Sequence, residues 1–161
     1  MHFHGYLVVA DSGVMLVDAG VGPAGGEAAE WLGVSGRLRG LLGQVGVGVE
    51  DVDAVVLTHV HLDHVGWASD GVRAGFPRAE YVVQRDELEH VRGGVTYERR
   101  IRPIEEAGGG AGVGGHDGDP DRGRASACCP VVHGRASRLR RHRRRGLPAV
   151  QALAPAAPDW R

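Results

Sequence analysis

The stretch Asp53-Ala54-Val55-Val56-Leu57-Thr58-His59-Val60-His61-Leu62-Asp63-His64 decides the fold and the chemistry of this chain. Its first five residues are mostly β-branched or aliphatic and too few for a helix, which predicts a buried strand. Three histidines and an aspartate follow within six residues, directly where that strand ends. Such a cluster at a strand end indicates a metal site rather than a chance grouping of polar residues.

The spacing of the four polar residues favours a particular kind of metal centre. On an extended chain His59 and His61 project to the same side, so two imidazoles can meet one cation. Asp63 and His64 are adjacent and point apart unless the chain turns, which suits a second cation beside the first. Small residues from Gly66 onward let that turn run into a helix. Imidazole with carboxylate favours zinc, with iron, manganese or cobalt as alternatives, over calcium or magnesium.

Residues 58–67, Thr-His-Val-His-Leu-Asp-His-Val-Gly-Trp, resemble the His-x-His-x-Asp-His signature of the metallo-β-lactamase superfamily. The likeness is closer to the hydrolase branch of acyl-homoserine lactonases and related esterases or phosphotriesterases than to the antibiotic-degrading branch. Residues 13–20 resemble the family's strand and turn ending in Asp-x-Gly, and residues 76–83 resemble its next strand. The resemblance covers roughly residues 2–106. It implies an α/β fold, the family's αββα sandwich of two mixed sheets between helices, in an incomplete version.

The resemblance also implies a role for each motif residue. His59 and His61 would bind a first cation. Asp63 and His64 would bind a second, giving about two zinc ions per chain in a complete site. A hydroxide between the metals would attack the substrate, and the metals would stabilise the resulting oxyanion. Asp63 would guide a proton to the leaving group, and Asp18 would lie beside the metals without ligating them. An aspartate in a turn is equally common for local hydrogen bonding.

The second half of the chain has a different character from the first. Residues 1–106 hold nine arginines against sixteen acidic residues, whereas residues 107–161 hold ten arginines against four. Residues 108–115 are almost all glycine and residues 135–145 are nearly an arginine tract, without the apolar periodicity that builds a core. We therefore expect the first segment to be the N-terminal half of a metallo-β-lactamase-like domain. The second segment is expected to be disordered or aberrant.

The ligands that would complete the site are hard to find in this second half. No Pro-Gly-His segment, which announces the family's third histidine, is present. Because each metal normally needs three protein ligands, His133 is the best candidate for a further ligand, and His116 is a weaker one. One hypothesis explains the change of character: residues 108–145 are translated from a shifted reading frame. The coding DNA tests that hypothesis.

The rest of the first half predicts an ordinary α/β unit. Short aliphatic runs at residues 3–10 and 14–17, separated by a turn signal, predict a β-hairpin. Apolar residues at helical spacing over residues 31–42 predict one helix, which its glycines weaken by about 1 kcal/mol each. After the motif we expect a strand at residues 81–84 and a helix from residue 86 to residue 91.

Composition excludes several classes of protein. Hydrophobic residues make up 42% of the chain and the net charge is −1, which is typical of a soluble globular domain. No stretch is apolar for long enough to span a membrane, and no cleavable leader follows Met1, so we expect a cytoplasmic protein. Cys128 and Cys129 are adjacent, which provides neither a disulfide framework nor a zinc-finger spacing.

Three functions remain open from the sequence. The first is a metal-dependent hydrolase that uses a metal-bound hydroxide on small esters, lactones or phosphotriesters. The second is a catalytically inactive fragment of such an enzyme, which the missing ligands favour. The third is nucleic-acid binding through the arginines of residues 138–145. The lack of interleaved aromatic residues favours a solvated or off-frame tract over that third function. The oligomeric state stays open.

Overall fold

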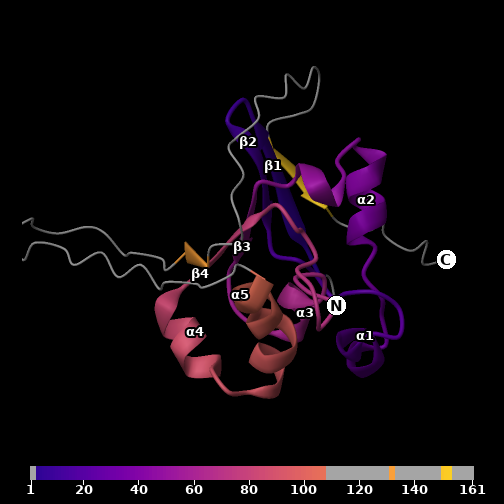
Figure 1. Ribbon diagram of the computed structural model, residues 1–161. Helices are drawn as coiled ribbons and strands as arrows, with labels where there is room; N and C mark the ends of the chain where they lie inside the picture. The colour runs from indigo at the N-terminus through magenta and orange to yellow at the C-terminus, as the bar shows by residue number, and fades with distance from the viewer. Residues whose placement is uncertain (1–2, 108–130, 133–149, 154–161) are drawn as a thin grey trace, which may run out of the picture.

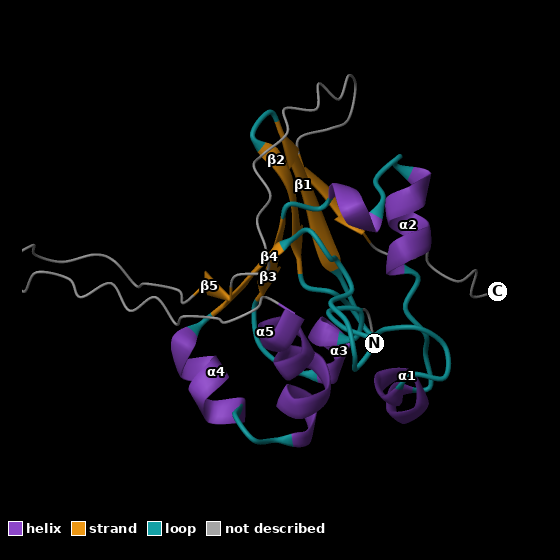
Figure 2. Cartoon of the chain, viewed as in Figure 1, coloured by secondary structure: helices purple, strands orange, loops and turns teal. Residues whose placement is uncertain are grey.

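The structure is a computed structural model that describes residues 3–107, 131–132 and 150–153. These residues form one mixed sheet with helices packed against it (Figures 1 and 2). In chain order the elements are β1 (Gly5–Ala10), β2 (Gly13–Val17), α1 (Glu27–Leu32), α2 (Leu38–Gln44), the 3-10 helix η1 (Val49–Asp51), β3 (Ala54–Leu57), α3 (Leu62–Val65), β4 (Glu80–Val83), α4 (Arg85–Val91), the π-helix η2 (Tyr97–Ile101), α5 (Arg102–Ala107), β5 (Val131–Val132) and β6 (Val150–Leu153).

The strand order of the sheet is β5-β4-β3-β2-β1-β6. β1 and β2 form the predicted antiparallel hairpin, and β2, β3 and β4 run parallel to one another. β5 and β6 pair antiparallel with β4 and β1, so residues from the second half of the chain lie at both edges (Figure 1). Because β2, β3 and β4 are parallel, their carboxyl ends lie at the same end of the sheet, and the residues that follow these strands come together there.

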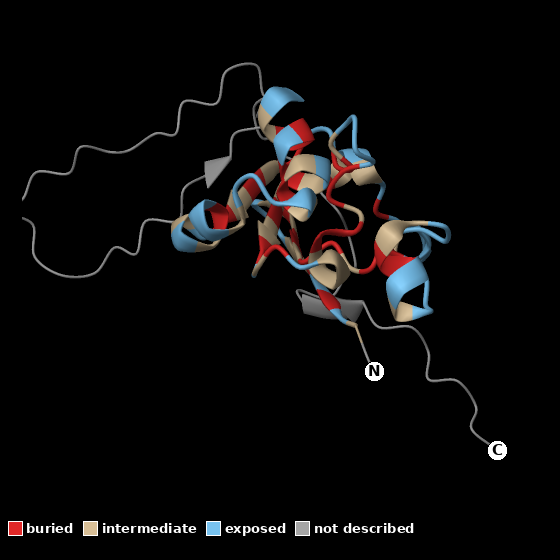
Figure 3. Ribbon diagram, turned by 90° about the horizontal axis from the view of Figure 1, so that it is seen from below, coloured by how far each residue is buried: buried red, intermediate tan, exposed pale blue. Residues whose placement is uncertain are grey.

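One face of the sheet forms the core. Side chains alternate along a strand, so every second residue of β2, β3 and β4 points to the same face. The buried residues on that face are Leu7, Val14, Leu16, Val55, Leu57, Tyr81 and Val83, and they form one cluster with apolar residues of α2, α4, η2 and α5. In Figure 3 the buried segments lie in the middle of the described chain and the exposed segments on its outside. This packing fixes the strand ends on which the candidate site is built.

The opposite face of the sheet is apolar as well. It carries Tyr6, Val8, Met15, Val17, Val56 and Val82, and the strand register aligns Tyr6 with Val17, Val17 with Val56, and Val56 with Val82. None of these side chains belongs to the core clusters formed by the described residues. Tyr6 is 48% exposed. The sheet is therefore covered by the described helices on one face only.

The prediction of one helix over residues 31–42 was wrong. Two helices, α1 and α2, occupy this region. Gly33 ends α1 in the left-handed conformation, with φ of 67°, which side chains other than glycine adopt only at a cost. Trp31 and Val34, the first apolar residues of the apparent periodicity, are 75% and 42% exposed and do not face the core. The helix expected to follow the turn at Gly66 is instead α3, which begins at Leu62 and includes motif residues.

The other predicted elements of the first half are confirmed. The motif strand is β3, the strand expected at residues 81–84 is β4, and the helix expected from residue 86 is α4. The predicted boundary near residue 106 stays a prediction. The arginine-rich residues 138–145 lie outside the described residues. In the part of the chain that the structure describes, no helix has the length and apolar character needed to cross a membrane.

Candidate functional site

The motif lies at the carboxyl ends of two neighbouring parallel strands. β2 ends directly before Asp18 and β3 ends directly before Thr58. The Asp18 N–H donates to the Val56 carbonyl at 2.8 Å, and the Ala19 N–H donates to the His64 carbonyl at 2.6 Å. These backbone hydrogen bonds hold the turn after β2 against both β3 and α3. The turn and the motif therefore form one unit.

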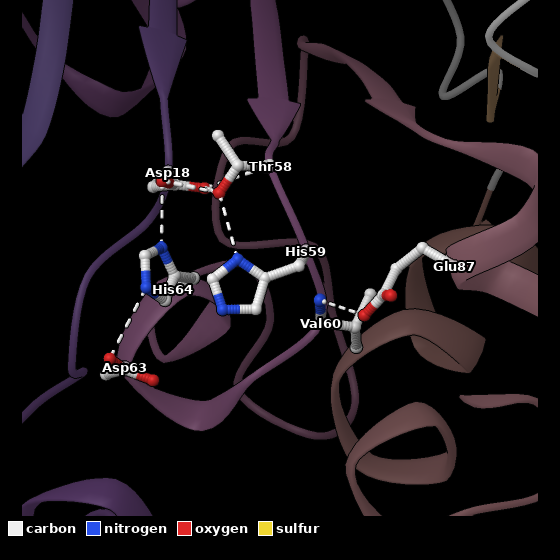
Figure 4. Close-up of polar contacts among 7 residues, drawn as sticks. All are labelled: Asp18, Thr58, His59, Val60, Asp63, His64 and Glu87. Atoms are coloured by element: carbon white, nitrogen blue, oxygen red, sulfur yellow. Dashed lines mark hydrogen bonds and ion pairs between the residues drawn. The ribbon is translucent and has the colours of Figure 1, made fainter. Parts of the chain in front are cut away.

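Asp18 is the centre of the polar contacts in this unit (Figure 4). Its Oδ1 accepts hydrogen bonds from the Thr58 backbone N–H and from Thr58 Oγ1, each at 2.9 Å. Its Oδ2 lies 2.8 Å from His64 Nδ1. Asp18 is buried, and in the described part of the chain no other non-glycine residue has a positive φ; its value is 61°. A left-handed non-glycine residue stores strain, which is found most often at functional sites.

The four ligands predicted within the motif, His59, His61, Asp63 and His64, lie close together. The ring centroids of His59 and His61 are 4.6 Å apart in an edge-on contact, and those of His59 and His64 are 3.9 Å apart. His64 Nε2 lies 3.4 Å from Asp63 Oδ2. His59 Nδ1 lies 3.1 Å from Thr58 Oγ1. The one-turn helix α3 folds the second half of the motif back toward the first, so adjacent residues that would point apart on an extended chain face one cluster.

The surroundings of His59 lower its pKa. Partial burial is the largest cause, followed by the nearby imidazoles of His64 and His61, while Asp18 and Asp63 act in the opposite direction. A lowered pKa keeps the imidazole neutral at neutral pH. The neutral ring is the form that binds a metal ion.

The motif residues fit zinc by donor type. Three imidazoles and two carboxylates within one polar cluster are a donor set that zinc prefers. Among the described residues, however, no three histidine, cysteine, aspartate or glutamate side chains are arranged as ligands of one ion. His64 turns Nδ1 to Asp18 and Nε2 to Asp63. The 3.4 Å between His64 Nε2 and Asp63 Oδ2 is about the separation of two ligand atoms on one tetrahedral zinc ion, so these two side chains can share a metal as they stand.

Glu87 contributes to the site and was not anticipated from the sequence. Its Oε1 accepts a hydrogen bond from the Val60 backbone N–H at 2.8 Å, in the middle of the motif (Figure 4). Glu87 is in the first turn of α4, which follows the carboxyl end of β4 at the same end of the sheet as the motif. Only the parallel pairing of β3 with β4 places Glu87 near the motif, and the local sequence does not state that pairing. The further candidate ligands His133 and His116 lie outside the described residues.

Three solved structures are similar to the chain. The dizinc quorum-quenching lactonase AidC, in complex with a product, is 26% identical, over 52% of this chain and 26% of that chain, with a TM-score of 0.44. The hydrolase AbOPH of the beta-lactamase superfamily is 34% identical, over 52% and 27%, with a TM-score of 0.41. A probable metal-dependent hydrolase from Staphylococcus aureus is 26% identical, over 58% and 35%, with a TM-score of 0.49.

The chain matches only about a quarter to a third of the length of these three proteins. None of the curated proteins matches it. A family model described as the metallo-beta-lactamase superfamily matches residues 4–127, which is more than half of the chain and includes the whole motif and the turn at Asp18. The chain therefore belongs to the metallo-beta-lactamase superfamily.

Proposed function

We propose that this protein is a metal-dependent hydrolase of small esters, lactones or phosphotriesters. The observation that carries the proposal is the gathering of three imidazoles beside a buried carboxylate at the carboxyl ends of β2 and β3, with ring centroids 3.9 Å and 4.6 Å apart. Family membership supports the same reaction class. The substrate range rests on the resemblance of the motif to the lactonase and esterase branch.

In this proposal His59 and His61 hold one zinc ion. Asp63 and His64 hold a second, and His133 supplies a further ligand. Zinc in these positions would lower the pKa of a water molecule and polarise the carbonyl or phosphoryl oxygen of the substrate. Asp63 would guide a proton to the leaving group. A cytoplasmic location stays a prediction.

The residues around the ligands would orient them. Asp18 accepts from His64 Nδ1 and so fixes which ring nitrogen of His64 turns toward Asp63 and the proposed metal position. Thr58 donates to Asp18 through both its backbone and its hydroxyl, which holds the carboxylate in place. Asp18 and Thr58 are therefore positioning residues for the proposed ligand His64.

A second candidate is a catalytically inactive member of the family. The observation that favours it is the arrangement of the motif side chains, since no three of the described candidate ligands are set around one ion. The two candidates differ in whether the purified chain holds metal with its own residues.

The test is the metal content of the purified 161-residue protein, measured by mass spectrometry of the dissolved sample. We expect about two zinc ions per chain, lost in the double variant His59→Ala, His61→Ala. His90→Ala is the matched control, because His90 is exposed on α4 and outside the cluster. Zinc retained by the control and lost in the double variant supports the hydrolase, and hydrolysis of a lactone, an ester and a phosphotriester is then measured. A folded chain without bound metal would contradict the hydrolase and support the catalytically inactive member of the family.

A further inference from the structure

A pocket of about 500 Å³ lies beside the C-terminal end of α3. Its volume is in the range of small-molecule sites. Its lining includes no residue of the motif from His59 to His64. The walls come from the loop before α1, from the segment after α3, from α2 and from η2, with the charged or aromatic members Glu27, Arg39, Trp67, Asp70, Arg99 and Arg100.

Two of its three arginines are held in place by neutral groups. Arg100 Nη1 donates to the Ser69 carbonyl at 2.7 Å and more weakly to the Gly66 carbonyl at 3.4 Å. The Arg39 guanidinium lies over the Trp67 ring, 4.8 Å from its centroid, and donates to a backbone carbonyl at 3.5 Å. Neither arginine is paired with a carboxylate among the described residues. Both positive charges are therefore oriented but not neutralised.

Both acidic residues of the lining have contacts within the fold. Glu27 Oε2 lies 3.1 Å from Arg99 Nη1, so these two charges offset each other, although Oε2 is buried and accepts no hydrogen bond in the described part of the chain. Asp70 Oδ1 accepts the backbone N–H groups of Val72 and Arg73 at 2.8 Å and 2.7 Å within its own turn. The lining carries three arginines against two carboxylates, so its net charge is +1.

Two buried donors in the lining lack an acceptor. Arg100 Nε and Trp67 Nε1 are inaccessible to solvent and have no hydrogen-bond partner in the described part of the chain. A buried donor without a partner destabilises a fold until an acceptor reaches it. The Arg100 guanidinium also has no carboxylate partner among the described residues, so its positive charge remains available to the pocket through its terminal nitrogens.

We propose that this pocket binds a small organic oxyanion, a carboxylate or a phosphate monoester, between Arg39 and Arg100. A guanidinium presents parallel N–H donors in a planar fork that matches the two oxygens of such a group. The Trp67 ring offers an apolar wall to the rest of the molecule. The site does not depend on the metal centre, because none of the proposed metal ligands lines it.

The test is isothermal titration calorimetry of the full 161-residue protein with butyrate, methyl phosphate and the neutral butyramide. We expect saturable binding of one anion per chain, with the better of the two anions identifying the preferred oxyanion, and no binding of butyramide. The double variant His59→Ala, His61→Ala should bind the anion as the native chain does. Anion binding by the double variant therefore tests the pocket independently of the proposed hydrolase, because either proposal can fail while the other holds.

Matched arginine variants locate the binding. Arg39→Gln should weaken binding at least tenfold, and Arg100→Lys, which keeps the charge but loses the fork and Nε, should weaken it several-fold. Arg37→Gln is the control, because Arg37 is exposed, lies two positions from Arg39 and does not line the pocket. If Arg100→Lys fails to fold, as judged by circular dichroism, the comparison of Arg39 with Arg37 still decides.

Three results would overturn the proposal. The first is the absence of saturable binding of either anion at millimolar concentration. The second is equal binding of butyramide, since the charge would then not be recognised. The third is equal weakening by Arg37→Gln and Arg39→Gln, which would mean general attraction by the many arginines of the chain, including those of residues 135–145, rather than a site in the pocket.

Discussion

Asp18 joins three parts of the candidate metal centre through one carboxylate, which contacts Thr58 and His64 while its backbone turns at the end of β2. The variant Asp18→Asn keeps the shape of the side chain and tolerates the positive φ, but removes the negative charge facing His64. Loss of such a partner of a ligating histidine typically weakens metal binding about 10- to 100-fold. We expect that loss in a zinc competition titration with a chelator.

The control for this variant is Asp11→Asn, since Asp11 is exposed in the turn of the β1–β2 hairpin, far along the strands from the motif. Its zinc affinity should equal that of the native chain. Equal affinity in Asp18→Asn and in the native chain would show that Asp18 does not orient His64 for a metal.

Tyr97 links the ionisation of one residue to the stability of the fold. It is buried and donates to Glu105 Oε2 at 2.6 Å, and burial together with that carboxylate raises its pKa to about 12. In the unfolded chain the phenol ionises near pH 10, about its ordinary value. The folded state therefore keeps a proton that the unfolded state releases. The resulting stabilisation is complete below about pH 10 and is lost as the pH rises toward 12.

The variant Tyr97→Phe should flatten the fall in the free energy of unfolding between about pH 10 and 12, measured by urea denaturation followed by circular dichroism. Part of the fall should remain, because burial also raises the pKa of Tyr81. Tyr6→Phe is the matched control, since Tyr6 is exposed and belongs to neither core cluster of the described residues. An unchanged slope in Tyr97→Phe would contradict the link.

At the level of the residue the sequence predicts the proposed ligands and, by resemblance, Asp18 beside them, but not the other supporting residues. His59, His61, Asp63 and His64 are recognisable because they are close in the chain and follow a clear strand. Thr58 and Glu87 are separated by 40 and 27 positions from the groups that they contact, Asp18 and Val60. Contacts of that kind depend on which strands are neighbours in the sheet. A local sequence pattern does not specify those neighbours.

At the level of the element, α3 fits against the turn after β2 only because Gly66 has no side chain. A Cβ at Gly66 would overlap the backbone of Val21 and Gly22, neither of which is the movable end of a side chain. We expect Gly66→Ala to destabilise the fold by about 3 kcal/mol, because the backbone must shift to relieve the overlap. The free energy of unfolding in urea measures this.

Gly40→Ala is the matched substitution. Gly40 lies inside α2 with no atom within 4 Å of its added Cβ, so the variant gains the better helix propensity of alanine. It should stabilise the chain by about 1 kcal/mol. If both alanine variants changed stability in the same direction, the close approach at Gly66 would not control the packing of α3.

Helix boundaries were the weakest part of the sequence prediction at this scale. The apolar spacing over residues 31–42 fits one helix, yet Gly33 adopts a left-handed conformation and ends α1. Glycine is frequent throughout this region, so its presence alone does not mark which position terminates a helix. The strands were easier to predict, because short β-branched runs such as residues 54–57 are bounded by polar residues on both sides.

At the level of the whole molecule, the four strands β1 to β4 were expected from the sequence and the two outer strands were not. β5 and β6 come from a part of the chain that gave no strand pattern, since β5 has only two residues and β6 stands between alanines and prolines. Their positions are determined by pairing with β4 and β1. Pairing of that kind depends on the tertiary structure of the inner sheet, and no local sequence pattern predicts it.

The strand order places β5 against β4 and β6 against β1, so these two short strands cover the two edges of the inner sheet. A chain ending at Ala107 would lose β5 and β6 together, leaving the hydrogen-bonding groups of β4 and of β1 unpaired at opposite edges. Open edges are templates for pairing with other chains. We expect that truncated chain to self-associate at concentrations where the full chain does not, as measured by sedimentation velocity. Equal sedimentation of the two chains would contradict this.

Two open edges differ from one in what they can build. A molecule with a single open edge can pair with one other copy and stop, whereas a molecule open at both edges can add a neighbour on each side without limit. The truncated chain should therefore form extended, growing assemblies rather than dimers. By pairing at the two ends of the strand order, β5 and β6 replace edge strands of four and six residues, β4 and β1, with shorter ones of two and four, and a short edge strand is a poorer template for another chain.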